Sequence, residues 1–125
     1  MYVICKEVTF AAAHMIRGYD GKCARIHGHN WRVRLEVACE KLNEIGTGVD
    51  FGDLKRILQD IVGKLDHRDL GELNAFAHSN PTAENVARHI FEEASRRLDG
   101  EGRRVQRVQL WENDTSSVIY APEGA

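Results

Sequence analysis

The most constraining feature of this sequence is a strict alternation of side-chain character that begins at His29. Odd positions carry side chains suited to burial and even positions carry polar ones: His29, Trp31, Val33, Leu35, Val37 and Cys39 against Asn30, Arg32, Arg34 and Glu36. This period of two is typical of a β-strand with one buried face and one exposed face. Residues 29–39 are therefore predicted to form a half-buried strand.

Three other segments have the character of strands. Residues 2–13 alternate less regularly and end in three alanines, while residues 104–112 and 117–121 flank the polar turn NDTS. Short runs of this kind, bounded by turn residues, are the usual signal for strands that pair with neighbours. One strand is expected near the amino terminus and two near the carboxyl terminus.

Two segments show helical spacing of apolar residues. Asp50 is a candidate N-cap for a helix whose apolar positions recur over residues 51–65. A second helix is expected to begin with Asn80 as N-cap and Pro81 in the first helical position, and to stop at Gly100.

The predicted order is strand, strand, helix, helix, strand, strand. Strands that are segregated from helices favour an α+β architecture, with an antiparallel sheet and two helices on one face. A length of 125 residues suits one domain with its own core, and no repeat or linker interrupts the sequence. Residues 1–125 are therefore expected to form a single domain.

Composition excludes several classes of function. Seventeen basic and nineteen acidic side chains give a net charge of -2, so no overall field attracts nucleic acid or an anionic membrane. No apolar run reaches the roughly 18 residues of a membrane span, and we expect neither a signal peptide nor an anchor. Three cysteines are too few for a secreted disulfide framework. We expect a cytoplasmic protein that binds neither nucleic acid nor membrane.

The segment CARIHGHN, residues 23–30, suggests a metal site. His27 and His29 project from the same face if the strand extends back through Gly28. His14, at the end of FAAAH, has the parity of the buried positions in its strand and could meet the pair from a neighbouring strand. Three histidines around Zn²⁺ leave a fourth position open, which is the arrangement of a catalytic zinc site.

Two other interpretations of the histidines remain open. An H-x-H pair is often only two hydrogen-bonded, partly buried imidazoles. Alternatively, Cys23 completes a Cys-His₃ structural zinc site, since its spacing from His27 permits this. We rank the structural site below catalysis, because a chain of this length with two good helices does not need a metal to fold.

A second group of titratable residues lies at LDHRDL. Asp66 directly precedes His67, and an acid beside a histidine can fix its tautomer and raise its basicity. The competing interpretation is a solvated helix end, where a histidine is favourable near the negative pole of the helix dipole.

Glu112 has the parity of the apolar residues Val108 and Leu110, so its carboxylate is expected to point toward the buried face. A carboxylate in that position needs a partner, and the N–H/NH₂ edge of a guanine or pterin would satisfy both oxygens. A strand-end acid turned into water is an equally good interpretation.

Six motifs occur in register over positions 10–114: FAAAH, C-x₃-HGHN, GVDFGDLK, LDHRDL, PTAEN and LWEND. Together they resemble the 6-pyruvoyl-tetrahydropterin synthase family over nearly the whole chain. The C-x₃-HGH spacing is most similar to the 6-carboxy-5,6,7,8-tetrahydropterin synthase branch, which belongs to the 7-deazaguanine (queuosine) pathway.

The resemblance implies a fold, an assembly and a set of roles. The fold is the tunnelling fold, or T-fold, in which sheets of neighbouring subunits join into a barrel, trimers pair into hexamers and active sites form between subunits. The roles are zinc ligation by three histidines, proton abstraction by a cysteine, acid-base assistance from an Asp-His pair, and pterin binding by a glutamate and, more weakly, a threonine. By this resemblance, His14, His27 and His29 would bind zinc, Cys23 would abstract the proton, and Asp66 and His67 would assist it. Glu112 and, more weakly, Thr82 would bind the pterin.

The implied reaction is the zinc-dependent conversion of 7,8-dihydroneopterin triphosphate to 6-carboxy-5,6,7,8-tetrahydropterin, with release of triphosphate and acetaldehyde. The first alternative is 6-pyruvoyl-tetrahydropterin synthase activity on the same substrate. A non-catalytic module with structural zinc is the second.

Overall fold

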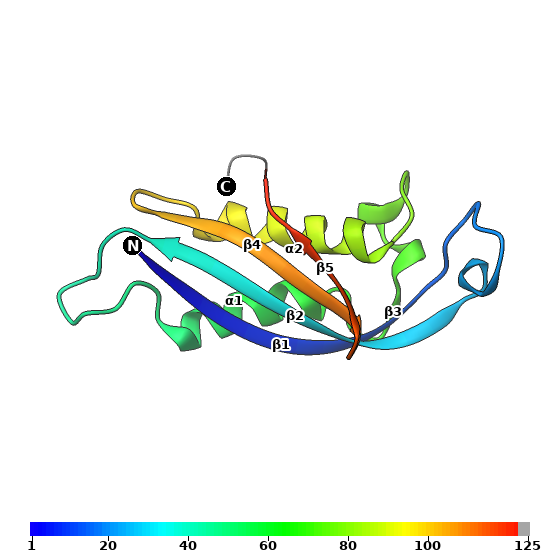
Figure 1. Ribbon diagram of the computed structural model, residues 1–125, viewed down its shortest axis with the longest axis horizontal. Coiled ribbons are helices and arrows are strands. Elements are labelled where there is room, and N and C mark those ends of the chain that lie inside the picture. The colour runs from blue at the N-terminus through cyan, green and yellow to red at the C-terminus, as the bar shows by residue number, and fades with distance from the viewer. Residues whose placement is uncertain (123–125) are drawn as a thin grey trace.

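A computed structural model describes residues 1–122, apart from the side chain of Cys23. Figure 1 shows the course of the chain. The strands are β1 (Tyr2–His14), β2 (His27–Cys39), β3 (Arg68–Asp69), β4 (Arg103–Asn113) and β5 (Ser116–Tyr120). The helices are α1 (Phe51–Gly63) and α2 (Ala83–Leu98), with single 3₁₀ turns η1 (Lys22–Ala24), η2 (Leu70–Glu72) and η3 (Asn74–Phe76).

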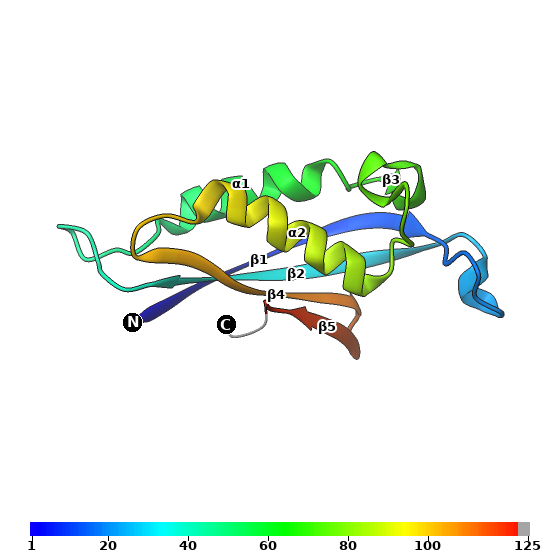
Figure 2. The same cartoon turned by 90° about the horizontal axis from the view of Figure 1, so that it is seen from above.

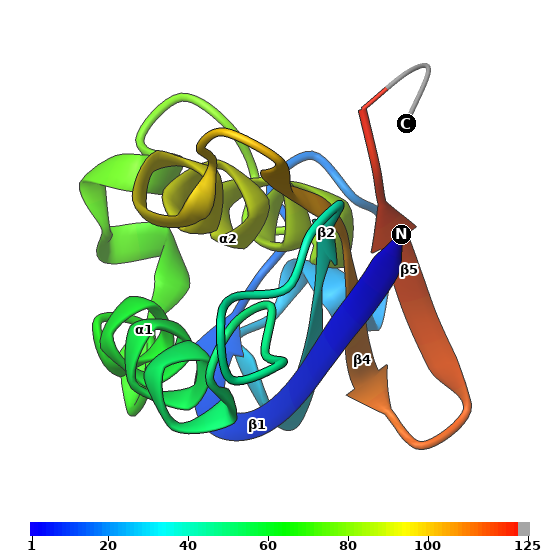
Figure 3. The same cartoon turned by 90° about the vertical axis from the view of Figure 1, so that its left-hand side faces the viewer.

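The strands form one sheet in the order β3-β1-β2-β4-β5. Both helices lie on the same face of this sheet, as Figures 2 and 3 show from two directions. The predicted α+β architecture with two helices on one face is therefore confirmed. The sheet differs from the prediction in one respect, because the two-residue strand β3 pairs in parallel with β1.

The alternation in β2 determines where the core lies. Trp31, Val33, Leu35 and Val37 are fully buried between the sheet and the helices. The helices contribute matching stripes of buried residues: Leu54, Leu58, Ile61 and Val62 from α1, and Val86, Ala87, Ile90, Phe91, Ala94 and Leu98 from α2. The face of the sheet that carries the histidines is thus the face that the helices cover.

The start of α1 agrees with the prediction, since Asp50 Oδ1 accepts hydrogen bonds from the backbone N–H groups of Gly52 (2.8 Å) and Asp53 (3.1 Å). The helix ends at Gly63, two residues earlier than its apolar pattern suggested.

The start of α2 does not agree with the prediction. The N-cap is Thr82, whose Oγ1 accepts from the backbone N–H of Asn85 at 3.1 Å, and Pro81 lies outside the helix. The end of the helix agrees with the prediction, since α2 ends at Leu98 with Asp99 as its C-cap and Gly100 follows directly. Asn80 does not cap the helix, because its side chain is hydrogen-bonded to the backbone of Arg17 instead.

The Thr82 cap leads to a stability prediction. Replacing Thr82 with alanine is expected to lower the free energy of unfolding by about 1 kcal/mol, because one N–H group of the first helical turn loses its acceptor. Thr82→Ser, which keeps a hydroxyl, is expected to retain the wild-type value. Urea denaturation of the two variants checks this, and equal losses in both would contradict a capping role.

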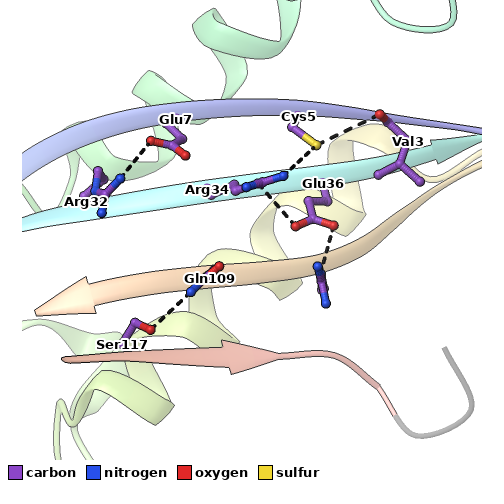
Figure 4. A network of polar contacts seen from close by, with 9 residues as sticks. Val3, Cys5, Glu7, Arg32, Arg34, Glu36, Gln109 and Ser117 are labelled. Carbon is purple, nitrogen blue, oxygen red and sulfur yellow. Dashed lines mark hydrogen bonds and ion pairs between the residues drawn. The ribbon is translucent and has the colours of Figure 1, made fainter. Parts of the chain in front are cut away.

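The opposite face of the sheet carries a polar network, shown in Figure 4. Glu36 is only 4% exposed and forms ion pairs with Arg107 Nε (2.8 Å) and Arg34 Nε (3.3 Å). Arg34 Nη2 also donates to Cys5 Sγ at 3.5 Å. Cys5 is therefore a half-buried member of this network, whereas Cys39 is buried in the core.

No helix among the described residues is long and apolar enough to cross a membrane.

Candidate metal centre

Strand pairing brings the three predicted histidines together. In the antiparallel register of β1 and β2, His14 lies opposite His27 and Ala12 lies opposite His29. Residues paired across two strands share a face, so all three imidazoles meet at one end of the sheet. Their ring centroids are 4.5 Å (His14–His27), 5.1 Å (His14–His29) and 4.9 Å (His27–His29) apart.

Glu112 joins this cluster from β4. Its Oε1 lies 3.1 Å from His14 Nε2 and 3.4 Å from His29 Nε2. One ligand atom from each of the four residues lies within 4.8 Å of the others. Strand parity predicts that this carboxylate points inward, and its position in the structure agrees. The register of β4 against β5 shifts between Trp111 and Asn113, at this residue.

Backbone carbonyls orient two of the imidazoles. His14 Nδ1 lies 2.8 Å from the carbonyl oxygen of Pro81, and His27 Nδ1 lies 2.7 Å from that of Arg25. Because a carbonyl can only accept, each Nδ1 is the donor in these contacts, and each Nε2 is the nitrogen left to bind a metal. This is the usual arrangement of metal-binding histidines.

The cluster meets the requirements of a metal site. His14 Nε2 and His29 Nε2 are buried and, among the described residues, have no hydrogen-bond partner of suitable geometry, although Glu112 is close to both. A buried polar atom without a partner is costly, and a metal ion would provide one. Three imidazole nitrogens with a carboxylate oxygen form a ligand set that Zn²⁺ accepts.

The local electrostatics favour a neutral imidazole at His29. Burial lowers the pKa of His29, and the nearby His14 and His27 lower it further. The carboxylate of Glu112 acts in the opposite direction but does not reverse the shift. A neutral imidazole is the form that binds metal, so the cluster keeps His29 ready for that role.

Asp66 and His67 form a pair directly after α1. Asp66 Oδ2 lies 3.0 Å from His67 Nδ1, and Asp66 Oδ1 accepts from the backbone N–H of Ala11 at 2.8 Å. The hydrogen bond from Ala11, followed by that from His67, lowers the pKa of Asp66. The structure therefore contains the acid-histidine contact that the sequence suggested, with Asp66 held in its ionised form.

His67 has an unusual backbone conformation. Its φ is +59°, in the left-handed region that residues with a Cβ seldom adopt, and its backbone N–H donates to the carbonyl of Ala11. Its side chain is 82% exposed, so the ring is free to meet a molecule from solvent.

A hollow of about 460 Å³ connects the two groups of residues. His29 lines it from β2, His67 lines it from the segment after α1, and the small residues Ala11, Ala13 and Gly28 of the two long strands also line it. A molecule in this hollow would contact a histidine of the metal cluster and His67 together.

The two other predicted site residues are placed less fully. Cys23 belongs to η1, but its side chain lies outside the described residues. Thr82 is half-buried and uses its hydroxyl to cap α2, next to the Pro81 carbonyl that orients His14. The carbonyls of Pro81 and Arg25 were missed by sequence reasoning, because a backbone carbonyl has no signature in the amino-acid sequence.

Comparisons with known proteins show what this chain is similar to. The profile of the 6-pyruvoyl tetrahydropterin synthase family matches residues 3–123. The 6-carboxy-5,6,7,8-tetrahydropterin synthase of Synechocystis is 40% identical over 96 residues, 73% of each chain. The dihydroneopterin monophosphate aldolase of Pyrococcus furiosus is 33% identical and covers 92% of this chain and 93% of its own.

The fold has a close counterpart among solved structures. The 6-pyruvoyl tetrahydropterin synthase of Caenorhabditis elegans superposes with a TM-score of 0.86 at 23% identity, covering 98% of this chain and 96% of its own. The family profile and the identity to the Synechocystis synthase make this chain a pterin-synthase type of protein. The chain belongs to the 6-pyruvoyl tetrahydropterin synthase family.

Proposed function

We propose that this chain is a zinc enzyme that converts 7,8-dihydroneopterin triphosphate to 6-carboxy-5,6,7,8-tetrahydropterin, with release of triphosphate and acetaldehyde, in 7-deazaguanine (queuosine) biosynthesis. The observation that carries the proposal is the convergence of His14, His27 and His29 beside a hollow that His67 also lines. The 40% identity to a 6-carboxytetrahydropterin synthase supports this choice of product.

His14, His27 and His29 would hold the zinc ion. Bound there, Zn²⁺ would act as a Lewis acid that makes the hydroxylated side chain of the pterin more acidic. The carbonyls of Pro81 and Arg25 keep two of the three imidazoles in the tautomer that this role needs.

Glu112 would bind the N–H and NH₂ edge of the pterin ring through both carboxylate oxygens. One of those oxygens now lies 3.1 Å from His14 Nε2. The same carboxylate cannot contact this histidine and hold the ring fully, so its side chain would turn away from the histidines when a pterin binds.

Cys23, as thiolate, would take a carbon-bound proton from the substrate side chain. A free cysteine has a pKa near 8.5, so positive charge nearby has to lower it for this role. His67, oriented by the ionised Asp66, would return a proton as the ring is reduced and the side chain oxidised. The redox change is internal to the substrate, so no nicotinamide or flavin is needed.

Assembly into a barrel of trimers, paired into hexamers, is part of the proposal. Within the described residues, most of β1 pairs only with β2, and β5 pairs only with β4. Open strand edges of this kind are normally covered or paired. Pairing with neighbouring subunits would cover these edges. Each subunit would be the single domain of residues 1–125, and the active sites would lie between subunits.

Two sister activities compete with the proposal. A 6-pyruvoyl-tetrahydropterin synthase would use the same substrate and leave a pyruvoyl side chain. An aldolase of the kind found in Pyrococcus furiosus would act on dihydroneopterin monophosphate, so its relationship to this chain makes that activity the second competitor.

Product identity tests the proposal. The zinc-loaded protein is incubated separately with 7,8-dihydroneopterin triphosphate and with the monophosphate, and the pterin products are identified by mass spectrometry. We expect 6-carboxytetrahydropterin and acetaldehyde from the triphosphate. A pyruvoyl product, or turnover of the monophosphate alone, would assign the chain to a sister activity.

Cys23→Ala is measured in the same assay. We expect it to keep its zinc and to lose at least tenfold of the turnover, in line with the loss of a general base. Full turnover with zinc retained would show that another group takes the proton. Loss of zinc from this variant would favour the structural Cys-His₃ site.

A further inference from the structure

A dense group of hydrogen bonds joins the loop after β1 to the segment before α2. Asn80 Oδ1 accepts from the backbone N–H of Arg17 (2.9 Å) and from its Nε (3.2 Å), and Asn80 Nδ2 donates to the backbone carbonyl of Arg17 (2.8 Å). Arg17 Nη2 donates to the carbonyls of Ser79 (2.9 Å) and Phe76 (3.4 Å). We call these contacts the Arg17–Asn80 clasp.

The clasp joins the loop formed by residues 15–26 to a segment that is distant in the sequence. The other hydrogen bonds of the described residues in this loop stay within it or reach His27 next to it, as between Ala24 and Gly21. One amide side chain thus satisfies both backbone polar groups of Arg17, 63 residues away in the sequence. Hydrogen bonds that tie a loop to a distant segment restrict its motion, because the loop can move only when several of them break together.

The clasp is also continuous with the metal cluster. Asn80, Pro81 and Thr82 are consecutive, and each has its own contact: Asn80 binds Arg17, the Pro81 carbonyl accepts from His14 Nδ1, and Thr82 caps α2. Asn85 Nδ2 donates to the Asn80 carbonyl at 2.8 Å, which anchors the segment to the first turn of the helix. Because the proline ring fixes φ, a displacement of Asn80 is passed on to the carbonyl that orients His14.

From these contacts we infer that Arg17 and Asn80 are positioning residues, which set the orientation of the metal ligand His14 and the placement of loop 15–26 through a single clasp. The second part rests on the proposed function, since this loop carries Cys23 in the sequence. Neither residue has to touch the substrate to act in this way.

The clasp is tested with Asn80→Ala, which removes three of its hydrogen bonds, and with Asn74→Ala as the control. Asn74 is an exposed asparagine in the same connecting segment, and no side-chain hydrogen bond is found for it in the described structure. Zinc affinity is measured by competition with a chelator, and backbone hydrogen exchange of residues 15–26 is measured in the zinc-loaded protein.

Asn80→Ala is expected to weaken zinc binding by about 10-fold or more, the usual effect of losing a group that orients a ligand. Hydrogen exchange in loop 15–26 is expected to become about tenfold faster, and kcat to fall more than KM rises. Asn80→Asp keeps the Oδ1 acceptor and should lie between the wild type and Asn80→Ala in all three measurements. Asn74→Ala should match the wild type.

Wild-type zinc affinity and loop exchange in a folded Asn80→Ala variant would overturn the inference. If that variant does not fold, Asn80→Asp and Arg17→Ala decide the matter together, because the first removes the Nδ2 donor and the second removes the guanidinium contacts of the exposed Arg17. Unchanged exchange and zinc affinity in both variants would then also overturn it. A wild-type protein that makes no pterin product, but in which Asn80→Ala still alters zinc affinity and exchange, would refute the proposed function and leave the clasp in place.

Discussion

Replacing His27 with alanine is expected to lower the zinc affinity of the protein by at least about 100-fold, because even the loss of a group that only orients a metal ligand costs 10- to 100-fold. Turnover at limiting zinc should fall in proportion. His27 is a suitable test position because it is half-buried at the end of β2, so its removal leaves the fully buried core residues in place.

The folded state is expected to survive this change. The core is built from side chains of both helices and of β1, β2 and β4, such as Val33, Leu58 and Val108, and His27 is not part of it. Zinc binding stabilises the folded chain by mass action, by about 4 kcal/mol at a thousandfold excess over Kd, so its loss lowers the melting temperature without unfolding the protein at 25 °C.

Circular dichroism and chelator competition measure the two effects separately. His78→Ala is the matched control, since His78 is exposed and lies outside the cluster. Chelation of zinc from the wild type should likewise leave a folded, inactive protein. Unfolding on chelation at 25 °C would contradict a catalytic centre and support the structural-zinc interpretation.

The parts of the site that strand periodicity controls could be predicted from the sequence. His27 and His29 share a face because side chains alternate along a strand, and Glu112 follows the parity of Val108 and Leu110. His14 required a further assumption, namely that β1 and β2 are neighbours. The structure places it opposite His27, where antiparallel pairing of consecutive strands brings it.

The parts that depend on tertiary contacts could not be predicted in the same way. Asn80 and Thr82 are both good N-cap residues, and the choice between them is made by Arg17, which binds Asn80 from a distant loop. Strand β3 has only two residues and hence no period to detect. The contact between Glu112 and the histidines depends on where β4 lies against β2, and the bulge between Glu36 and Val37 alters that register.

His67→Gly is expected to reduce turnover by about 10²- to 10⁴-fold, the usual contribution of a general acid or base. Most substitutions lower the free energy of unfolding, but this one is not expected to lower it. Glycine adopts a positive φ freely, whereas a residue with a Cβ at φ +59° is strained by roughly 1–2 kcal/mol. Relief of this strain is partly offset by the greater freedom of glycine in the unfolded chain.

The free energy of unfolding of His67→Gly is therefore expected to equal the wild-type value or to exceed it by up to about 1 kcal/mol. The side chain is 82% exposed, so its removal takes little packing with it. Backbone strain of this kind is common at functional sites, so the strained φ of His67 supports a functional role for its side chain.

Urea denaturation and turnover are measured on the same zinc-loaded preparation, with added imidazole as a further probe. Because the ring faces open solvent, free imidazole can reach the place it leaves, and partial recovery of turnover is expected. Asp66→Asn should lower turnover as well, because a neutral amide would replace the carboxylate whose Oδ2 lies 3.0 Å from His67 Nδ1. Wild-type turnover in His67→Gly would remove His67 from the proton transfer, and a loss of more than about 2 kcal/mol in stability would show that its side chain serves the fold instead.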